Sequence, residues 1–278
     1  DGACLLLDGV HTATPEALAL LVRGKATGIT LDGLTTLTVA QATPFADFNG
    51  ELTLDGLTHL DADVALALGH GVWSGPKRLF LDGLTSLDGP TADALSKYNT
   101  VMLHLDGLQE LTPEAARGLA SWDGPIGRIL SLNGLKQLSP GAAEGLAQLR
   151  VDSVDSLSLE GLETLAPKAA AALVGDKEHG WSTMRLPVHR FDTATLDVLT
   201  TWDTRELEEL ICTGSTPSAE KLVVLGRWSG DGELVLSAET LDLETAMALG
   251  SFGGRTLELR ELGTASDDVV TALTGFQG

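Results

Sequence analysis

Leucines alternate with polar residues in a short pattern that returns along the whole chain. The clearest copies read leucine or isoleucine, any residue, leucine, then Asp-Gly (once Asn-Gly, once Glu-Gly) and leucine, at residues 29–37, 52–60, 79–87, 103–111, 130–138 and 157–165. A first copy covers residues 5–10, and degenerate copies follow at 184–186, 210–212, 234–236 and 257–259. The eleven copies lie roughly 23 to 27 residues apart, which is the period of a solenoid.

Each copy predicts a strand followed by a turn. In the fifth copy, Leu103 and Leu105 point to one side of the strand while Met102 and His104 point to the other, as in a half-buried strand. The Asp-Gly pair predicts a turn in which glycine supplies a positive φ. The two leucines that follow return to the core.

A short helix is predicted after each turn. In the fifth repeat it begins after Thr112, with a hydroxyl N-cap, proline at the first position and an acid in the first turn. The same signal recurs at Thr14, Ser139, Ala166 and Thr216, and starts without proline are predicted near Asp61, Asp192, Asp242 and Ser266. Pro44 falls inside the second helical segment and predicts a short or broken helix.

Aromatic residues close several of these helices and are expected to pack between neighbouring repeats. They are Phe48, Trp73, Tyr98, Trp122, Trp202, Trp228 and Phe252.

One unit cannot bury its leucines alone, so the units must stack around a shared core. Strands stack about 4.8 Å apart, whereas helices are about 10 Å across, so the stack must bend. We therefore predict an α/β, right-handed horseshoe of about 11 repeats, a single domain over residues 1–278, with a parallel sheet on the concave face and helices on the convex face. Both ends fall at the same point of the repeat, which we interpret as a fragment of a longer chain.

The pattern resembles that of the leucine-rich repeat proteins over the whole chain, most strongly in the first seven repeats. Most such proteins have asparagine three residues after the second strand leucine, where this chain has Leu108 and its counterparts. The Pro-Glu-Ala-Ala run at 113–116 is closer to a bacterial variant. The resemblance implies protein or peptide recognition on the concave sheet and, through bacterial members, a cell-surface or secreted location.

Charge and composition narrow the partner class. The net charge is −21 with a pI of about 4.4, so nucleic acid is not an expected partner. The acidic charge is consistent with basic partners, with cations or with simple solubility, and solubility is the favoured interpretation. No apolar run approaches the ~20 residues of a membrane span. Cys212 stands at a strand-leucine position, far from Cys4, and is expected to be buried as a small apolar residue without a disulfide.

The acidic residue after each strand forms a column with two interpretations. Its members are Asp8, Asp32, Asp55, Asp82, Asp106, Asn133 and Glu160. Because stacked carboxylates repel, the column either binds a basic peptide or calcium, or accepts hydrogen bonds from backbone N–H groups two residues on and replaces the missing asparagines. Asn133 favours the second interpretation, because it keeps the acceptor without the charge.

The outward strand positions carry the prediction of a partner-binding site. Most are small and polar, but repeats four to six place five larger side chains there, namely Arg78, Phe80, Met102, His104 and Ile129. Apolar and arginine side chains grouped on a surface are typical of a binding hot spot. His104 by itself is interpreted as a solvated surface histidine rather than a ligand or a pH switch.

The sequence predicts no enzyme. It contains no HExxH, phosphate-loop or GxSxG motif, and no cofactor or metal ligands are assigned. The predicted function is a non-enzymatic protein- or peptide-binding module that uses the concave sheet. The alternative is a structural spacer or adhesive segment of a larger bacterial surface protein.

Overall fold

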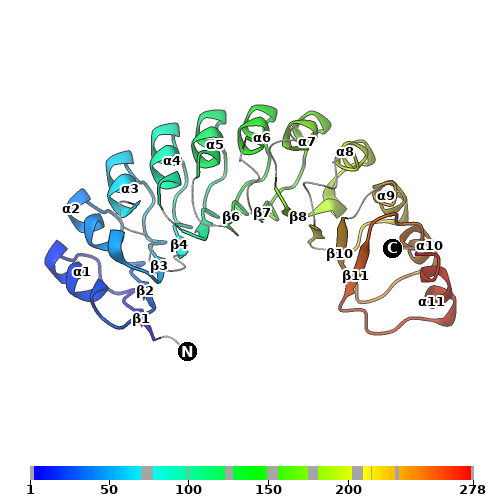
Figure 1. Cartoon of the computed structure of the whole chain (residues 1–278), viewed down its shortest axis with the longest axis horizontal. Coiled ribbons are helices and arrows are strands. Elements are labelled where there is room, and N and C mark those ends of the chain that lie inside the picture. The colour runs from blue at the N-terminus through cyan, green and yellow to red at the C-terminus, as the bar shows by residue number, and fades with distance from the viewer. Residues whose placement is uncertain are drawn as a thin grey trace.

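The computed structural model describes residues 3–69, 78–98, 100–122, 128–148, 156–174, 181–201, 209–213, 215–228 and 232–276. The chain forms an arc of repeats in which the strands line the inside and the helices the outside (Figure 1). Trp73 and Trp202, two of the aromatic residues expected to close helices, lie outside the described residues.

One parallel sheet runs through the arc with its strands in chain order. Its strands are β1 (Cys4–Leu6), β2 (Gly28–Thr30), β3 (Glu51–Thr53), β4 (Arg78–Phe80), β5 (Met102–His104), β6 (Ile129–Ser131), β7 (Ser156–Ser158), β8 (Thr183–Leu186), β9 (Glu209–Cys212), β10 (Glu233–Ser237) and β11 (Thr256–Arg260). Equivalent positions pair throughout, as in Leu79, Leu103 and Leu130. The predicted register is confirmed.

Helices cover the outside of the sheet. They are α1 (Pro15–Val22), α2 (Val39–Ala42), α3 (Ala62–Gly69), α4 (Gly89–Ser96), α5 (Pro113–Ala120), α6 (Pro140–Leu146), α7 (Pro167–Val174), α8 (Thr193–Leu199), α9 (Ala219–Leu225), α10 (Leu243–Gly250) and α11 (Asp267–Leu273), with 3-10 turns η1 (Thr43–Asp47) and η2 (Val188–Arg190). Small residues let them approach closely. A Cβ atom added to Gly145 in α6 would lie 2.7 Å from the Cβ atom of Ala116 in α5.

Outside the fifth repeat, seven of the eight predicted helix starts are confirmed. Thr14 and Ser139 cap α1 and α6, and α7 begins at Pro167. The helices near the four other acidic or hydroxyl positions begin where predicted, at Asp61, Asp192, Asp242 and Ser266. The start at Thr216 is wrong, because α9 begins two residues later, after Ser218. Pro44 lies in η1 and ends α2 after four residues, as predicted.

The core is aliphatic and continuous along the arc. Leu31, Leu54, Leu81, Leu105, Leu132 and Leu159, the second leucine of each strand pattern, are fully buried. Five described aromatic residues that close helices are buried as predicted: Phe48, Tyr98, Trp122, Trp228 and Phe252. The Phe252 ring lies 6.2 Å from Trp228 and 6.1 Å from Phe276, so these rings connect successive repeats.

The turn after each strand differs from the prediction that its glycine supplies a positive φ. The N–H of Leu108 donates to the carbonyl of Leu105 (3.2 Å), which closes a four-residue turn. Gly107 does not have a positive φ. A Cβ atom there would lie 2.0 Å from the carbonyl oxygen of Asp82 in the preceding repeat, so glycine is required by the close approach of two backbones.

Among the described residues, the helices are too short and too polar to cross a membrane.

Candidate binding surface on the concave sheet

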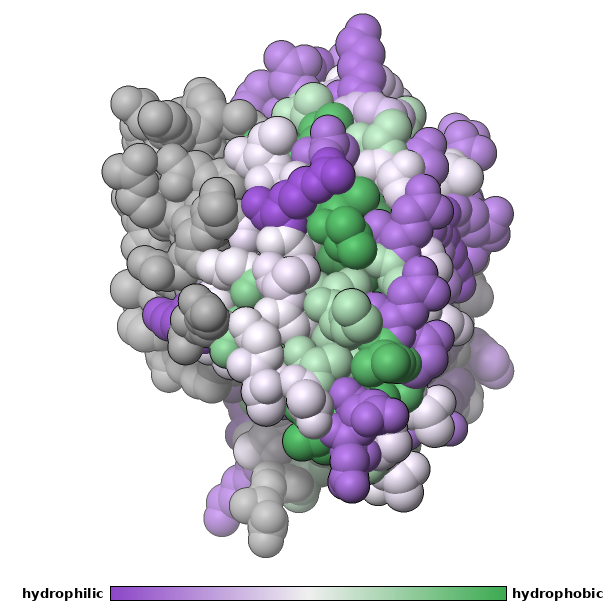
Figure 2. Space-filling view, turned by 90° about the vertical axis from the view of Figure 1, so that its right-hand side faces the viewer, coloured by the Kyte–Doolittle hydropathy of each residue, from purple (hydrophilic) through white to green (hydrophobic). Residues whose placement is uncertain are grey.

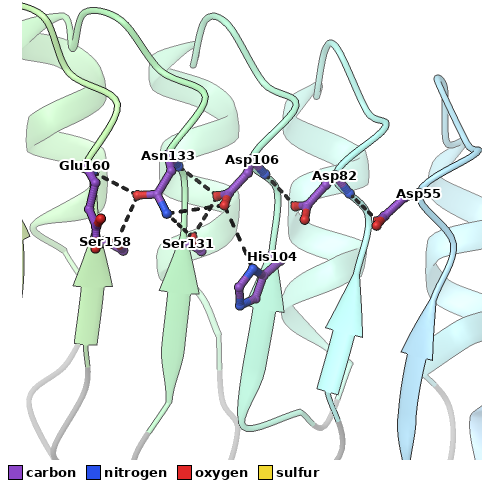
Figure 3. Close-up of polar contacts among 8 residues, drawn as sticks. All are labelled: Asp55, Asp82, His104, Asp106, Ser131, Asn133, Ser158 and Glu160. Atoms are coloured by element: carbon purple, nitrogen blue, oxygen red, sulfur yellow. Dashed lines mark hydrogen bonds and ion pairs between the residues drawn. The ribbon is translucent and has the colours of Figure 1, made fainter. Parts of the chain in front are cut away.

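The acidic column forms a hydrogen-bonded ladder that runs across the C-terminal ends of the strands (Figure 3). From Asp32 to Asn133, the Oδ1 atom of each residue accepts from the backbone N–H of its counterpart in the next repeat. Asp55 donates to Asp32 (3.0 Å), Asp82 to Asp55 (2.8 Å), Asp106 to Asp82 (2.8 Å), Asn133 to Asp106 (2.8 Å) and Glu160 to Asn133 (2.8 Å). The column therefore holds neighbouring repeats together.

The hydrogen-bonding interpretation of the column is thus confirmed, but its predicted partner is wrong. The donor is not an N–H two residues on in the same turn; it is the N–H of the adjacent repeat. The next residue along the ladder after Glu160 is Pro187, which follows β8 and has no N–H to donate. The ladder therefore ends where its donor is lost.

Serines reinforce the middle of the ladder. The Ser131 hydroxyl donates to Asp106 Oδ1 (2.7 Å), and the Ser158 hydroxyl donates to Asn133 Oδ1 (2.8 Å). Asn133 Nδ2 donates to Asp106 Oδ2 (3.2 Å). Asp106 therefore accepts three hydrogen bonds, more than the other aspartates of the described ladder.

Two ladder carboxyls are shifted toward their neutral form. Desolvation by burial raises the pKa of Asp82, and the neighbouring Asp106 carboxylate raises it further, although the N–H of Asp106 lowers it. Burial also raises the pKa of Asp55, with contributions from Asp82 and Asp32. Because an acid with a raised folded-state pKa favours protonation on folding, these charges cost stability at neutral pH.

We expect Asp82→Asn to raise the free energy of unfolding at pH 7 in chelator-treated buffer. Asparagine keeps the acceptor for the Asp106 N–H and removes the desolvated charge. The advantage should shrink as pH falls through the raised folded-state pKa and vanish below the ordinary value near 3.8. Urea unfolding of both proteins from pH 7 to pH 3.5 measures this difference. N-cap carboxyls such as Asp88, whose pKa is lowered by Thr91, lose stabilisation in acid equally in both proteins. A constant difference across the range contradicts the assignment.

The five residues of the predicted partner site lie together. Pairing of β4, β5 and β6 places Arg78, Met102 and Ile129 in one row and Phe80 and His104 in the next. Arg78 is exposed and the other four are half-buried. The rings of Phe80 and His104 are 4.4 Å apart at 36°, and Arg78 pairs with Glu51 at 3.5 Å. We refer to these five residues as the concave patch.

Other outward positions differ from the prediction. The alternation along the strands predicts outward side chains for Ile211 and Val235, between the two leucine positions. They are 6% and 1% exposed, so they are buried side chains of β9 and β10. Glu258 beside Val235 forms an ion pair with Arg260 (3.0 Å), and Glu233 pairs with Arg255 (2.9 Å). The last two strands, β10 and β11, therefore carry charged pairs beside these buried apolar side chains. Cys212 is buried, which raises the pKa of its thiol, and Cys4 is exposed.

A second apolar surface lies on the convex side and was missed by the sequence analysis. Figure 2 shows hydrophobic side chains bordered by hydrophilic ones at the C-terminal side of the arc, where Val223, Leu243, Met247 and Val270 are exposed. A groove of about 900 Å³ runs between α8, α9 and α10, beside the ion pair of Arg227 and Asp197 (3.0 Å). The sequence did contain a signal for this surface, because apolar residues occupy helix positions that are expected to face solvent.

Comparisons with known proteins support the fold. No protein-family model matches the chain, and no curated protein matches its sequence. The crystal structure of the leucine-rich repeat-containing protein LegL7 from Legionella pneumophila is similar, with a TM-score of 0.59 and 13% sequence identity over 98% of this chain and 89% of that chain. An arc of eleven parallel strands backed by short helices, matched across nearly its whole length by that structure, has the leucine-rich repeat fold.

Proposed function

We propose that the chain is a non-enzymatic binding module that recognises a protein or peptide on its concave sheet. The observation that carries the proposal is the concave patch. Phe80 stands where neighbouring repeats have Thr53 and Ser158. Arg78 and Met102 belong to the other row, where neighbouring repeats have Glu51 and Ser156. Apolar and arginine side chains that share one surface supply the anchors of most protein interfaces. The fold, which offers a rigid curved sheet, supports the same function.

The chemistry beside the patch favours a basic partner. The ladder carboxylates run past one end of the patch, and the chain as a whole carries a net charge of −21. Arg78 is already paired with Glu51, so it adds little free positive charge. A peptide that packs an apolar side chain on Phe80 and Met102 and places lysine or arginine over the carboxylates would complement both features.

A structural role is the second candidate. Small side chains such as Thr30, Thr53 and Ser156 occupy the outward positions outside the patch, as expected for a spacer or adhesive segment without a dedicated site. The two functions differ in one measurable respect, because only a binding module shows saturable capture that depends on the patch.

We expect the double substitution Phe80→Ser and Met102→Ser to weaken peptide binding by about 10- to 100-fold, since two apolar anchors each contribute about 1 kcal/mol or more. Wild-type protein selects binders from a displayed library of basic and apolar peptides, and calorimetry then gives the affinity of a selected peptide for each variant. The matched control is Leu20→Ser with Val270→Ser, two exposed apolar residues of α1 and α11.

Circular dichroism and urea unfolding should show the array intact in both double variants, because neither pair is fully buried. Equal affinity of the wild type and the patch variant contradicts the patch assignment. A library from which no peptide binds saturably supports the spacer.

A further inference from the structure

Three metal-binding side chains converge at the middle of the ladder. One ligand atom from each of Asp82, His104 and Asp106 lies within 4.8 Å of the other two. We propose that these residues bind a divalent transition-metal ion such as Zn²⁺. This inference does not depend on the proposed peptide binding, and it is tested in the absence of any partner.

The fold explains why these three groups meet. Asp82 follows β4 and Asp106 follows β5, so in-register pairing of these strands sets their carboxylates side by side. His104 precedes Asp106 by two residues and therefore shares its side of the strand. Figure 3 shows the imidazole beneath the Asp106 carboxylate, where Nδ1 lies 4.0 Å from Oδ2.

The ladder positions the carboxylates and leaves them with lone pairs to spare. Asp82 Oδ1 is engaged by the Asp106 N–H, and Asp106 Oδ1 by the Asn133 N–H and the Ser131 hydroxyl. Asp106 Oδ2 accepts one longer bond from Asn133 Nδ2, and among the described residues no hydrogen bond reaches Asp82 Oδ2. The Oδ2 atoms are thus held in place through bonds to their neighbours and remain able to bind a metal.

The histidine is what distinguishes this place from the rest of the ladder. Thr53, Ser131 and Ser158 occupy the equivalent position in other repeats of the ladder, so those carboxylates have no imidazole beside them. His104 is also oriented, because its ring stacks against Phe80 at 4.4 Å. The three groups are half-buried, which leaves a path for an ion from solvent.

The local charge favours a dication. Within the described part of the chain, no lysine or arginine forms an ion pair with these two aspartates, and the nearest basic nitrogen is His104 Nδ1, 4.0 Å from Asp106 Oδ2. The two carboxylates lie side by side and repel each other, which costs energy in the protein alone. A bound divalent ion would neutralise the pair and remove this cost.

The donor set selects the kind of metal. One imidazole nitrogen and two carboxylate oxygens suit Zn²⁺ and its transition-metal neighbours, whereas Ca²⁺ and Mg²⁺ prefer oxygen ligands alone. Zn²⁺ holds ligands at about 2.0–2.2 Å, so the three atoms must close to about 3.3–3.5 Å by side-chain rotation. Three protein ligands leave a fourth position open toward the concave face.

Calorimetric titration of chelator-treated protein with ZnCl₂ tests the proposal. We expect one site per chain, a rise in Tm with Zn²⁺, and a loss of affinity of at least about tenfold in Asp82→Asn and in His104→Gln. The matched controls are Asp32→Asn, which changes a ladder aspartate far from His104, and His59→Gln, which changes an exposed histidine; both should bind Zn²⁺ as the wild type does. A parallel titration with CaCl₂ should show much weaker binding.

Histidine NMR spectra of the wild-type protein provide a test that needs no variant, because the His104 ring signals should move first on addition of Zn²⁺. Three results would overturn the proposal: no Zn²⁺ binding at millimolar concentration, equal weakening by Asp32→Asn and Asp82→Asn, or binding that His104→Gln leaves unchanged. The last two would mean diffuse attraction of cations to an acidic surface.

Discussion

Alanine in place of Gly107 is expected to lower the free energy of unfolding by about 3 kcal/mol, at the upper end of overpacking effects. The added Cβ atom would lie 2.0 Å from the carbonyl oxygen of Asp82 and 2.6 Å from that of Leu84. Both are backbone atoms held by the stacking of repeats, so neither can move aside as a flexible side chain would. The strain must spread into the pairing of β4 with β5.

Gly9 provides the matched control, because it occupies the same place in the first repeat. A Cβ atom there meets nothing within 4 Å, and its φ is not positive. Gly9→Ala should therefore be neutral or stabilise the protein by up to about 1 kcal/mol, through the lower entropy of the unfolded chain. Urea unfolding followed by far-ultraviolet circular dichroism measures both variants. Comparable losses in the two would show that the turn needs glycine for its conformation rather than for close packing.

The parts of the fold that depend on periodicity could be predicted from the sequence. The spacing of leucines fixes which side chains enter the core, so the register of Leu79 with Leu103 follows from the sequence alone. The grouping of Phe80 with His104 follows from the same register. Helix starts such as Thr14 and Asp192 could be predicted because capping is a local interaction.

Features that depend on the distance between repeats could not be predicted in the same way. The Asp-Gly turn is consistent with either a positive φ or a close backbone contact, and only the position of the preceding repeat decides between them. The ladder donors belong to the next repeat for the same reason. Burial of Val235 depends on its neighbours in β9 and β11, and the proximity of His104 to Asp82 depends on side-chain direction across two strands.

The ladder itself is expected to be a major source of stability, and Asp106→Ala tests it where it is most connected. The substitution removes the acceptor for the Asn133 N–H, the Ser131 hydroxyl and Asn133 Nδ2. Leaving partly buried donors without a partner costs about 1 kcal/mol or more each, so we expect a loss of about 3 kcal/mol in the free energy of unfolding. Urea unfolding in chelator-treated buffer separates this effect from any bound metal.

Two further variants identify the cause of that loss. Asp106→Asn should recover most of it, because asparagine accepts from the Asn133 N–H as Asn133 itself accepts from Glu160 (2.8 Å). Recovery should be incomplete, since the new amide N–H₂ would face the Asn133 side-chain N–H₂. Asp8→Ala changes the same position in the first repeat, where no described hydrogen bond uses the side chain, and should change stability by less than about 0.5 kcal/mol. If Asp106→Asn were as unstable as Asp106→Ala, the negative charge rather than the acceptor would hold the repeats together, and the ladder would be electrostatic in origin.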